Sequence, residues 1–191
     1  RHIGERDDKK IHECVHTAML MSLVCGVFIG TVGFFASSYM LRIMDVPDDV
    51  LELASLYLKI YFLGSPGLLA YNFGASIIRA TGDTKRPLYI LSFSGLVNVL
   101  LNLLLIIVFE MGVSGVAIAT IVSQYLSAVF IVVYLLRMPN SCKLIINKLK
   151  IYKDELKSIV RLGVPAGVQN SLFSVSNGQS VTIVPSLTLA P

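Results

Sequence analysis

Four long stretches of this sequence carry almost no acidic or basic side chains, and they constrain its fold more than any other feature. A helix rises about 1.5 Å per residue, so about 20 apolar residues cross the hydrocarbon core of a bilayer, which is about 30 Å thick. Each stretch is long enough to do so. We therefore predict an all-α, polytopic membrane protein, a bundle of transmembrane helices whose spans cover residues 14–41, 50–78, 87–109 and 111–136.

The composition argues against a water-soluble globular domain. Only 15% of the residues are charged, against roughly 25% in typical soluble domains, and 54% are hydrophobic. The net charge of +4 does not indicate nucleic-acid binding, because the basic residues flank apolar stretches and form no basic, aromatic face. The cysteines at positions 14, 25 and 142 predict neither a disulfide nor a metal site, and no signal peptide is predicted.

Basic residues are distributed unevenly among the segments that connect the spans. Residues 1–10, 79–87 and 137–161 hold four, three and seven lysines and arginines, whereas the other connections hold only Arg42. Lys59 lies within a span and is assigned to neither side. Because cytoplasmic loops carry the excess of positive charge, we predict that these three segments face the cytoplasm. The chain is then a multi-pass protein of the plasma membrane.

The chain changes character after residue 137. In residues 138–160, apolar side chains recur at spacings of three and four among lysines, which predicts an amphipathic helical linker on the membrane surface. An ordinary soluble connector helix is the alternative. A further apolar segment begins at Arg161, and Pro185 interrupts the unusual tail that follows Asn177, so we expect a truncated end. The apolar positions of the linker are Ile145, Leu149, Tyr152, Leu156 and Ile159.

Glycine and proline mark positions where helices are expected to approach closely or bend. Gly26 and Gly30, followed by Gly33, would let the backbone of a neighbouring helix pack against the first span. In the second span Pro66 lacks a backbone N–H and follows Gly64, so we predict a bend at this point. The connection between the third and fourth spans is so short that these two helices are expected to form an antiparallel hairpin.

Amide side chains inside a span are costly in hydrocarbon, so they indicate either helix contacts or a polar pathway. Asn98 and Asn102 are four residues apart in the third span and therefore share one face of that helix. The fourth span has a second polar stripe, which we expect to point at the first. Hydrogen bonding between helices is the alternative to an ion or substrate pathway. The second stripe consists of Thr120, Ser123, Gln124 and Ser127.

Two further polar candidates lie in the second span. Lys59 either extends its long side chain toward the outer interface or lines an aqueous cavity. Asn72 lies farther along the same span, together with Ser76. We include Lys59 and Asn72, with Asn98, Asn102, Thr120 and Gln124, as candidates for an ion or substrate pathway.

The run His12-Glu13-Cys14-Val15-His16 matches the His-Glu-x-x-His signature, in which two imidazoles bind zinc and the glutamate is the general base. An intramembrane zinc protease is therefore one alternative function. A third ligand would be needed, and the only other histidine is His2. The motif lies at the cytoplasmic mouth of the first span. We interpret it as a set of polar residues at a helix entrance and predict no metal and no catalytic residue.

Three runs of the sequence, taken with their order and spacing, are similar to those of a known family. They are Arg79-Ala-Thr-Gly-Asp-Thr-Lys-Arg-Pro87, Asn98-Val-Leu-Leu-Asn102 and Gly112-Val-Ser-Gly-Val-Ala-Ile-Ala-Thr-Ile-Val-Ser-Gln124. The sequence resembles the multidrug and toxic compound extrusion (MATE) family of efflux transporters. The resemblance implies that the four spans are the third to sixth helices of a twelve-helix transporter with two six-helix lobes. Residues 1–137 would belong to the first lobe, 138–160 to the linker and 161–191 to the start of the second lobe.

The resemblance implies an antiporter rather than an enzyme, one that exports drugs or organic cations in exchange for Na⁺ or H⁺ by alternating access. The family's polar site in this lobe matches Asn98, Asn102 and Thr120. An amide cannot take up a proton, so Asn102 could only orient a carboxylate or offer its oxygen to a cation. The implied partners are membrane lipid and a small organic cation or drug, with no cofactor, nucleic acid or obligate protein partner. A related flippase-like carrier is the remaining alternative, and the chain by itself is expected to be an incomplete transporter.

Overall fold

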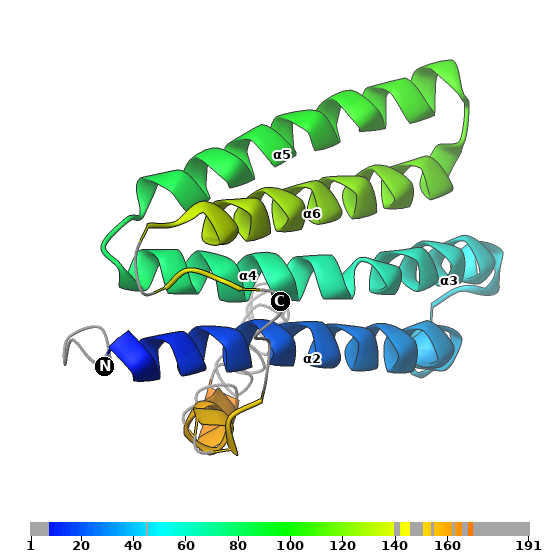
Figure 1. Cartoon of the computed structure of the whole chain (residues 1–191). Helices are drawn as coiled ribbons and strands as arrows, with labels where there is room; N and C mark the ends of the chain where they lie inside the picture. Colours follow the sequence, from blue (N-terminus) through cyan, green and yellow to red (C-terminus); the bar gives the residue numbers. More distant parts are fainter. Residues whose placement is uncertain are drawn as a thin grey trace, which may run out of the picture. The chain divides into compact units, whose positions relative to one another are not determined.

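The protein is built from helices. The computed structural model describes residues 8–44, 46–139, 142–145, 151–153, 155–161, 163–165 and 168–169, and no strand occurs among them. The chain divides into two compact units, residues 1–151 and residues 152–191. The helices of the first unit, labelled in Figure 1, are α2 (Asp8–Ile43), α3 (Asp48–Leu63), α4 (Ser65–Ala80), α5 (Lys85–Leu103), the π-helical turn η1 (Leu104–Val108) and α6 (Gly112–Arg137).

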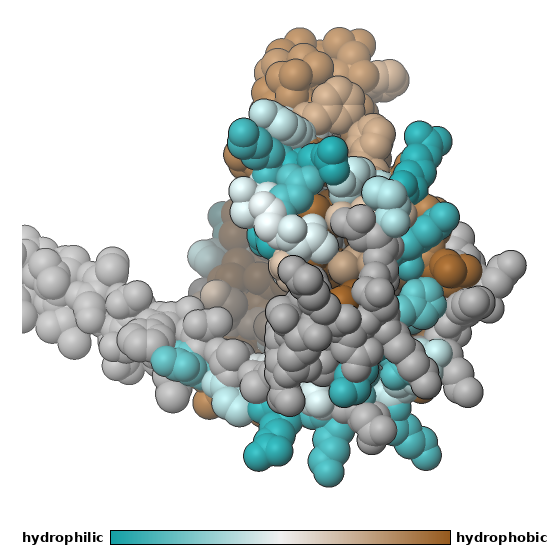
Figure 2. Space-filling view, turned by 60° about the vertical axis from the view of Figure 1, so that its left-hand side comes forward, coloured by the Kyte–Doolittle hydropathy of each residue, from teal (hydrophilic) through white to brown (hydrophobic). Residues whose placement is uncertain are grey.

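The length and apolar character of these helices suit a membrane. Within the described residues, Lys10–Ile43, Lys85–Val108 and Gly112–Arg137 are each long and apolar enough to cross one. Helices α3 and α4 make a fourth candidate span as a bent pair. The all-α, polytopic membrane fold predicted from the sequence is therefore confirmed. In Figure 2, which turns the end of the bundle where α4 ends and α5 begins toward the viewer, hydrophobic side chains gather at the top and hydrophilic ones lie below them.

The second predicted span bends where α3 ends and α4 begins. The two helices meet at Gly64 at an angle of 45°, and Pro66 in the first turn of α4 has no N–H to bond back to α3. The predicted bend is confirmed. Helix α2 packs across the bend at two glycines: a Cβ added to Gly26 would lie 2.5 Å from Pro66 Cα, and one added to Gly30 would lie 2.9 Å from the carbonyl oxygen of Phe62. The predicted close approach at these glycines is confirmed as well.

Helices α5 and α6 form the predicted hairpin, and Figure 1 shows them side by side. The turn between them has features that the sequence did not predict. In η1 the N–H of Phe109 bonds to the carbonyl of Leu104 at 3.3 Å, so the last turn of α5 is wider than an α-helical turn. Glu110 and Gly112 then adopt φ angles of 51° and 56°. Glycine adopts this left-handed conformation easily and glutamate rarely does.

The buried core lies where α2, α4 and α6 meet, and α5 contributes little to it. Only 6% of the apolar window of the α5 span is buried within the described residues. Tyr71 of α4 nevertheless reaches the start of α5, where its hydroxyl donates to the carbonyl of Pro87 at 2.8 Å. The buried residues of the core are Ile11, Val15, Met19, Tyr71, Ala75, Ile78, Ile131, Leu135, Met138, Cys142 and Leu144.

The chain that follows α6 returns to the core. Leu144 is buried, and its N–H bonds to the carbonyl of Leu135 at 3.1 Å. The backbone of Ile145 bonds to His16 of α2. Because these groups bond to α6 and α2 instead of to their own turn, residues 143–145 are not helical. The prediction that the linker helix includes Ile145 is therefore wrong.

The second unit is described only in part. Residues 155–161 are helical, and the N–H of Leu156 donates to the carbonyl of Tyr152 at 2.9 Å. The predictions for residues 1–7, for Leu149 and for the tail after Asn177 lie outside the described residues, as does most of the segment 161–191.

Candidate functional site

Polar side chains of α5 and α6 meet near the middle of the two helices. Asn98 Nδ2 donates to Ser123 Oγ at 3.2 Å, and Asn102 Nδ2 donates to Asn98 Oδ1 at 3.1 Å. Helical spacing puts both asparagines on one face of α5, and the bond to Ser123 shows that this face is turned toward α6. The two polar stripes recognised in the sequence therefore do meet. We refer to Asn98, Asn102 and Ser123 as the amide seam.

The amide seam contains an acceptor that is not used. Asn102 Oδ1 is buried, and no donor in the described part of the chain bonds to it. Leaving a buried acceptor unpaired costs about 1–3 kcal/mol. An amide oxygen can accept a hydrogen bond from an N–H or O–H of a ligand, or it can coordinate a hard cation. Asn102 is therefore the residue of the seam best placed to bind an ion or a substrate.

The hydroxyl groups beside the seam bond mainly to their own helix. Thr120 Oγ1 donates to the carbonyl of Val116 at 2.9 Å, and Ser123 Oγ donates to the carbonyl of Thr120 at 2.8 Å. Ser127 Oγ donates in the same way to the carbonyl of Gln124 at 2.8 Å. Each hydroxyl oxygen keeps lone pairs after donating its hydrogen. Thr120, one turn from Ser123 on the same face of α6, can therefore still accept a hydrogen bond or bind a cation.

Gln124 contacts a different part of the molecule. Its side chain lies against Gly64, so closely that the site has no room for a Cβ, and its buried Oε1 has no donor among the described residues. Tyr125, the next residue, donates its hydroxyl to the carbonyl of Leu63 at 2.8 Å. Helix α6 thus places two polar side chains at the bend between α3 and α4. The sequence analysis did not identify Tyr125, because an aromatic residue in a span is common and carries no positional signal.

Lys59 lies in a separate hollow of about 420 Å³ that is formed by α2 and α3. Asp48 and Glu52, from the start of α3, line the same hollow as Lys59. Ser38 Oγ and Ser55 Oγ, which also line the hollow, are hydrogen-bonded to each other at 2.6 Å across the two helices. We refer to this cavity as the charged hollow, after the side chains of Arg42, Asp48, Glu52 and Lys59 that line it.

Asn72 is exposed on α4 and does not reach the amide seam. Its Nδ2 donates to the carbonyl of Leu68 at 2.9 Å, one turn earlier in the same helix. Ser76 Oγ donates in turn to the carbonyl of Asn72 at 2.8 Å. The candidates from the sequence thus occupy several places: Asn98, Asn102 and Thr120 at or beside the seam, Gln124 at the bend, Lys59 in the charged hollow and Asn72 on an uncovered face.

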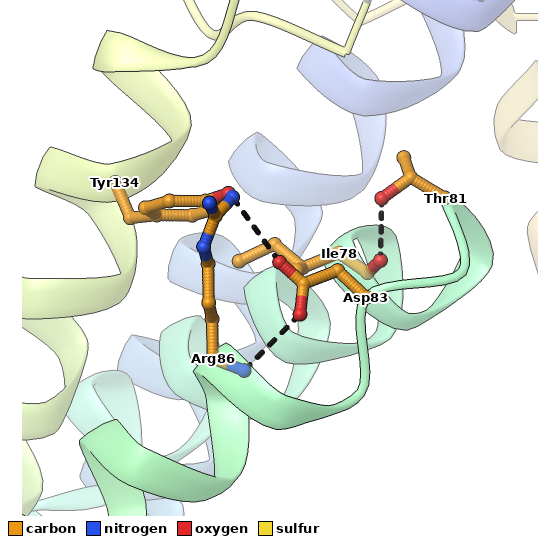
Figure 3. A network of polar contacts seen from close by, with 5 residues as sticks. All are labelled: Ile78, Thr81, Asp83, Arg86 and Tyr134. Atoms are coloured by element: carbon orange, nitrogen blue, oxygen red, sulfur yellow. Dashed lines mark hydrogen bonds and ion pairs between the residues drawn. The ribbon is translucent and has the colours of Figure 1, made fainter.

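A second contact joins α5 to α6 at the end of the bundle where α5 begins (Figure 3). The guanidinium of Arg86 lies over the Tyr134 ring, 5.0 Å from its centroid, and also donates to the Tyr134 hydroxyl. Asp83 pairs with this guanidinium at 3.2 Å, and its other carboxylate oxygen accepts the Arg86 backbone N–H, also at 3.2 Å. Asp83 thereby caps the first turn of α5. The sequence analysis did not identify Tyr134 as the partner, because the two residues are 48 positions apart.

His16 of the histidine motif bonds to backbone groups of its own helix and of the segment after α6. His16 is fully buried, and its Nδ1 lies 2.7 Å from the carbonyl oxygen of His12. Its Nε2 lies 3.0 Å from the backbone N of Ile145. With Nδ1 donating and Nε2 accepting, both ring nitrogens have backbone partners. This geometry does not favour the zinc-protease alternative, because a zinc ligand needs a free nitrogen lone pair.

Comparison with known proteins gives consistent similarities. A family model described as MatE matches residues 1–104. The probable multidrug resistance protein YpnP of Bacillus subtilis (strain 168) is 33% identical over 169 residues, which cover 87% of this chain and 37% of that protein. The chain thus spans less than two fifths of the length of this curated relative.

Two solved structures of transporters have the same helix arrangement. The outward-facing conformation of a multidrug resistance MATE family transporter of the MOP superfamily matches with a TM-score of 0.83 and 26% identity, over 92% of this chain and 39% of that one. The inward-facing conformation of such a transporter matches with a TM-score of 0.79 and 26% identity, over 86% and 38%. Both an outward-facing and an inward-facing transporter therefore contain a region with the fold of this chain.

Proposed function

Because the chain belongs to the MatE family, the multidrug and toxic compound extrusion transporters, we propose that the protein exports drugs or organic cations across the plasma membrane. It does so as a secondary antiporter, in exchange for Na⁺ or H⁺, by alternating access. The similarity to both an outward-facing and an inward-facing transporter supports this proposal, because alternating access requires a lobe that moves largely as one body. Since the relatives are named as multidrug proteins, the similarities do not favour the flippase-like alternative.

The observation that carries the proposal is the unpaired oxygen of the amide seam. Polar groups in the middle of a membrane bundle are costly, and they commonly mark the path of an ion or substrate. Here Asn98 and Ser123 bond to each other across the helices, whereas Asn102 Oδ1 is buried without a donor from the described residues. A transported cation or a substrate N–H group would supply the missing partner.

The side chains of α5 and α6 limit how ion coupling can work at the seam. Neither helix contains an aspartate or a glutamate. With Na⁺ as the coupling ion, Asn102 Oδ1 is a direct ligand. With H⁺, the proton is held by a carboxylate on another helix, and Asn102 orients that carboxylate by hydrogen bonding. The two mechanisms differ in which ion gradient drives export.

The proposed orientation places residues 1–10, 79–87 and 137–161 in the cytoplasm. The uneven distribution of lysine and arginine supports it. In Figure 2 the end of the bundle that this orientation assigns to the cytoplasm comes forward, and hydrophilic side chains are seen there.

The experiment is transport by the intact protein that contains this chain, purified and reconstituted in proteoliposomes, with ethidium as the organic cation. A Na⁺ gradient or a pH gradient of equal magnitude is imposed, and ethidium movement is followed by fluorescence against protein-free liposomes. We expect ethidium to move faster under one of the two gradients than without a gradient, in the direction opposite to the flow of the coupling ion. Equal rates with and without both gradients would contradict the proposal.

A further inference from the structure

The bend between α3 and α4 interrupts the backbone hydrogen bonds of the span at two positions. In a continuous α-helix, the N–H of each residue bonds to the carbonyl four residues earlier. Pro66 has no N–H to donate to the carbonyl of Phe62. Gly67 has an N–H, yet at the 45° bend no bond joins it to the carbonyl of Leu63 in this described stretch. The first interruption is therefore permanent, whereas rotation of the backbone can close the second.

Two neighbouring helices contact the carbonyl groups that the bend leaves open. The carbonyl oxygen of Phe62 faces Gly30 of α2, where an added Cβ would lie 2.9 Å from it. The carbonyl of Leu63 accepts the hydroxyl of Tyr125, on α6, at 2.8 Å. A backbone carbonyl at membrane depth needs a donor from within the protein. Tyr125 therefore occupies the place that the N–H of Gly67 has in a continuous helix.

The two possible donors to the Leu63 carbonyl lie next to each other. A Cβ added to Gly67 would lie 3.2 Å from Tyr125 Cδ1 and 3.3 Å from Tyr125 N. The absence of a side chain at Gly67 thus lets α6 approach the backbone of α4 beside the unused N–H. Only a small movement of α6 relative to α4 is needed to exchange one donor for the other. We refer to residues 63–67 as the hinge.

We propose that Tyr125 is a positioning residue that holds this span in its bent form, and that its hydroxyl and the N–H of Gly67 exchange at the Leu63 carbonyl during transport. With the tyrosine bonded, α3 and α4 keep their bend. When the hydroxyl leaves, the N–H takes the carbonyl, and the bend decreases to the part that Pro66 imposes. The use of this exchange in transport rests on the proposed function, whereas the exchange itself does not.

One turn of α6 connects the hinge to the amide seam. Ser123 accepts a hydrogen bond from Asn98 of α5, and Tyr125, two residues later, bonds to Leu63 at the end of α3. A ligand that binds Asn102 and moves this turn of α6 therefore moves both contacts. The hinge supplies what coupling between two sites requires, an element with two arrangements whose balance the binding site can change.

The bend is measured by electron–electron double resonance on the intact protein that contains this chain, in nanodiscs and without an ion gradient. Spin labels are attached at Leu53 of α3 and Ser76 of α4, both exposed, after the native cysteines are replaced by alanine. At about 1.5 Å per residue these positions are about 34 Å apart in a straight helix and about 3 Å closer at a bend of this size.

Tyr125→Phe deletes one oxygen atom and keeps the packing of the ring, so the variant is expected to fold. The population with the longer distance should rise about threefold, the change that loss of one interhelical hydrogen bond in a membrane produces. Tyr89→Phe is the matched control, because Tyr89 is exposed on α5, away from the hinge. It should leave the distances unchanged.

Ethidium export by the same variants separates positioning from ligand contact. Tyr125→Phe should lower the maximal rate about threefold, for the same reason, and leave the half-saturating ethidium concentration unchanged. A raised half-saturating concentration at an unchanged maximal rate would show that Tyr125 contacts the substrate and would overturn its positioning role. Parental distances in Tyr125→Phe would overturn the hinge. Absence of gradient-driven export by the parent protein would instead contradict the proposed function, which the distance measurement does not use.

Discussion

Two helix contacts in the middle of the bundle are built in opposite ways. Helix α2 meets the bend between α3 and α4 through Gly26 and Gly30, where an added Cβ would lie 2.5 Å from Pro66 Cα and 2.9 Å from Phe62 O. Helix α5 meets α6 through Asn98 and Ser123, at a hydrogen-bond distance of 3.2 Å. We refer to the first contact as the glycine joint. It consists of closely packed backbone, whereas the amide seam consists of hydrogen-bonding side chains.

We propose that the glycine joint holds the bundle together and that the amide seam binds a ligand. In lipid no hydrophobic force drives helices together, so close backbone packing and interhelical hydrogen bonds must do so. The glycine joint uses close packing of backbone atoms. The amide seam leaves Asn102 Oδ1 without a donor in the described part of the chain. We propose that a transported ion or substrate supplies the partner of this oxygen.

The largest effect is expected from Gly26→Ala in the glycine joint. The new Cβ meets Pro66 Cα, a backbone atom that cannot rotate away, so α2 must shift. Overpacking of this kind costs about 1–3 kcal/mol. Thermal unfolding in detergent should show a clear loss of stability.

Gly95→Ala is the matched control, because nothing described lies within 4 Å of a Cβ added there. Alanine is also a better helix former than glycine by about 1 kcal/mol, so this variant should not lose stability. Equal losses in the two variants would show that the glycine joint is not a closely packed contact.

A smaller effect is expected at the amide seam itself. A double-mutant cycle with Asn98→Ala and Ser123→Ala isolates the bond between these side chains, and interhelical hydrogen bonds in membranes contribute about 0.6 kcal/mol on average. Reversible unfolding in mixed micelles provides the free energies of unfolding of the parent protein, the two single variants and the double variant. A coupling energy larger than the loss caused by Gly26→Ala would reverse the ranking of the two contacts.

The smallest effect is expected where Arg86 and Tyr134 join the ends of α5 and α6. Asp83→Asn keeps a side chain that can cap α5 and removes the ion pair with Arg86, whose side chain is 60% exposed. Exposed pairs of this kind contribute about 0.3 kcal/mol. The loss should vanish in about 1 M salt, where the screening length falls to about 3 Å. The coupling between Asn98 and Ser123, which involves no charge, should not change with salt.

The features that follow from local chemistry were predictable from the sequence. Long uncharged stretches predict the spans, Gly64 and Pro66 predict the bend, and the four-residue spacing of Asn98 and Asn102 predicts a shared face. Each of these features depends on residues close together in the chain. Helical periodicity or the missing N–H of a proline is therefore sufficient to predict it.

The features that depend on tertiary contacts were not predictable. The side chain of Gln124 has the spacing of the polar stripe, yet it contacts Gly64 at the bend and not α5. Ile145 has the spacing of a linker helix, yet its backbone bonds to His16, 129 residues earlier. Helical periodicity identifies a face of a helix, but it does not say which neighbour that face will meet.

The central claim is that Asn102 Oδ1, the acceptor of the amide seam without a donor among the described residues, binds the transported ion or substrate. The most direct test is ethidium export by the Asn102→Leu variant. The control is Leu100→Ala on an exposed part of the same helix. Losing one buried hydrogen-bonding partner should slow export about tenfold, while thermal stability stays within about 1 kcal/mol of the parent protein. Leu100→Ala should export ethidium at the parental rate. Parental export by a folded Asn102→Leu variant would contradict the account.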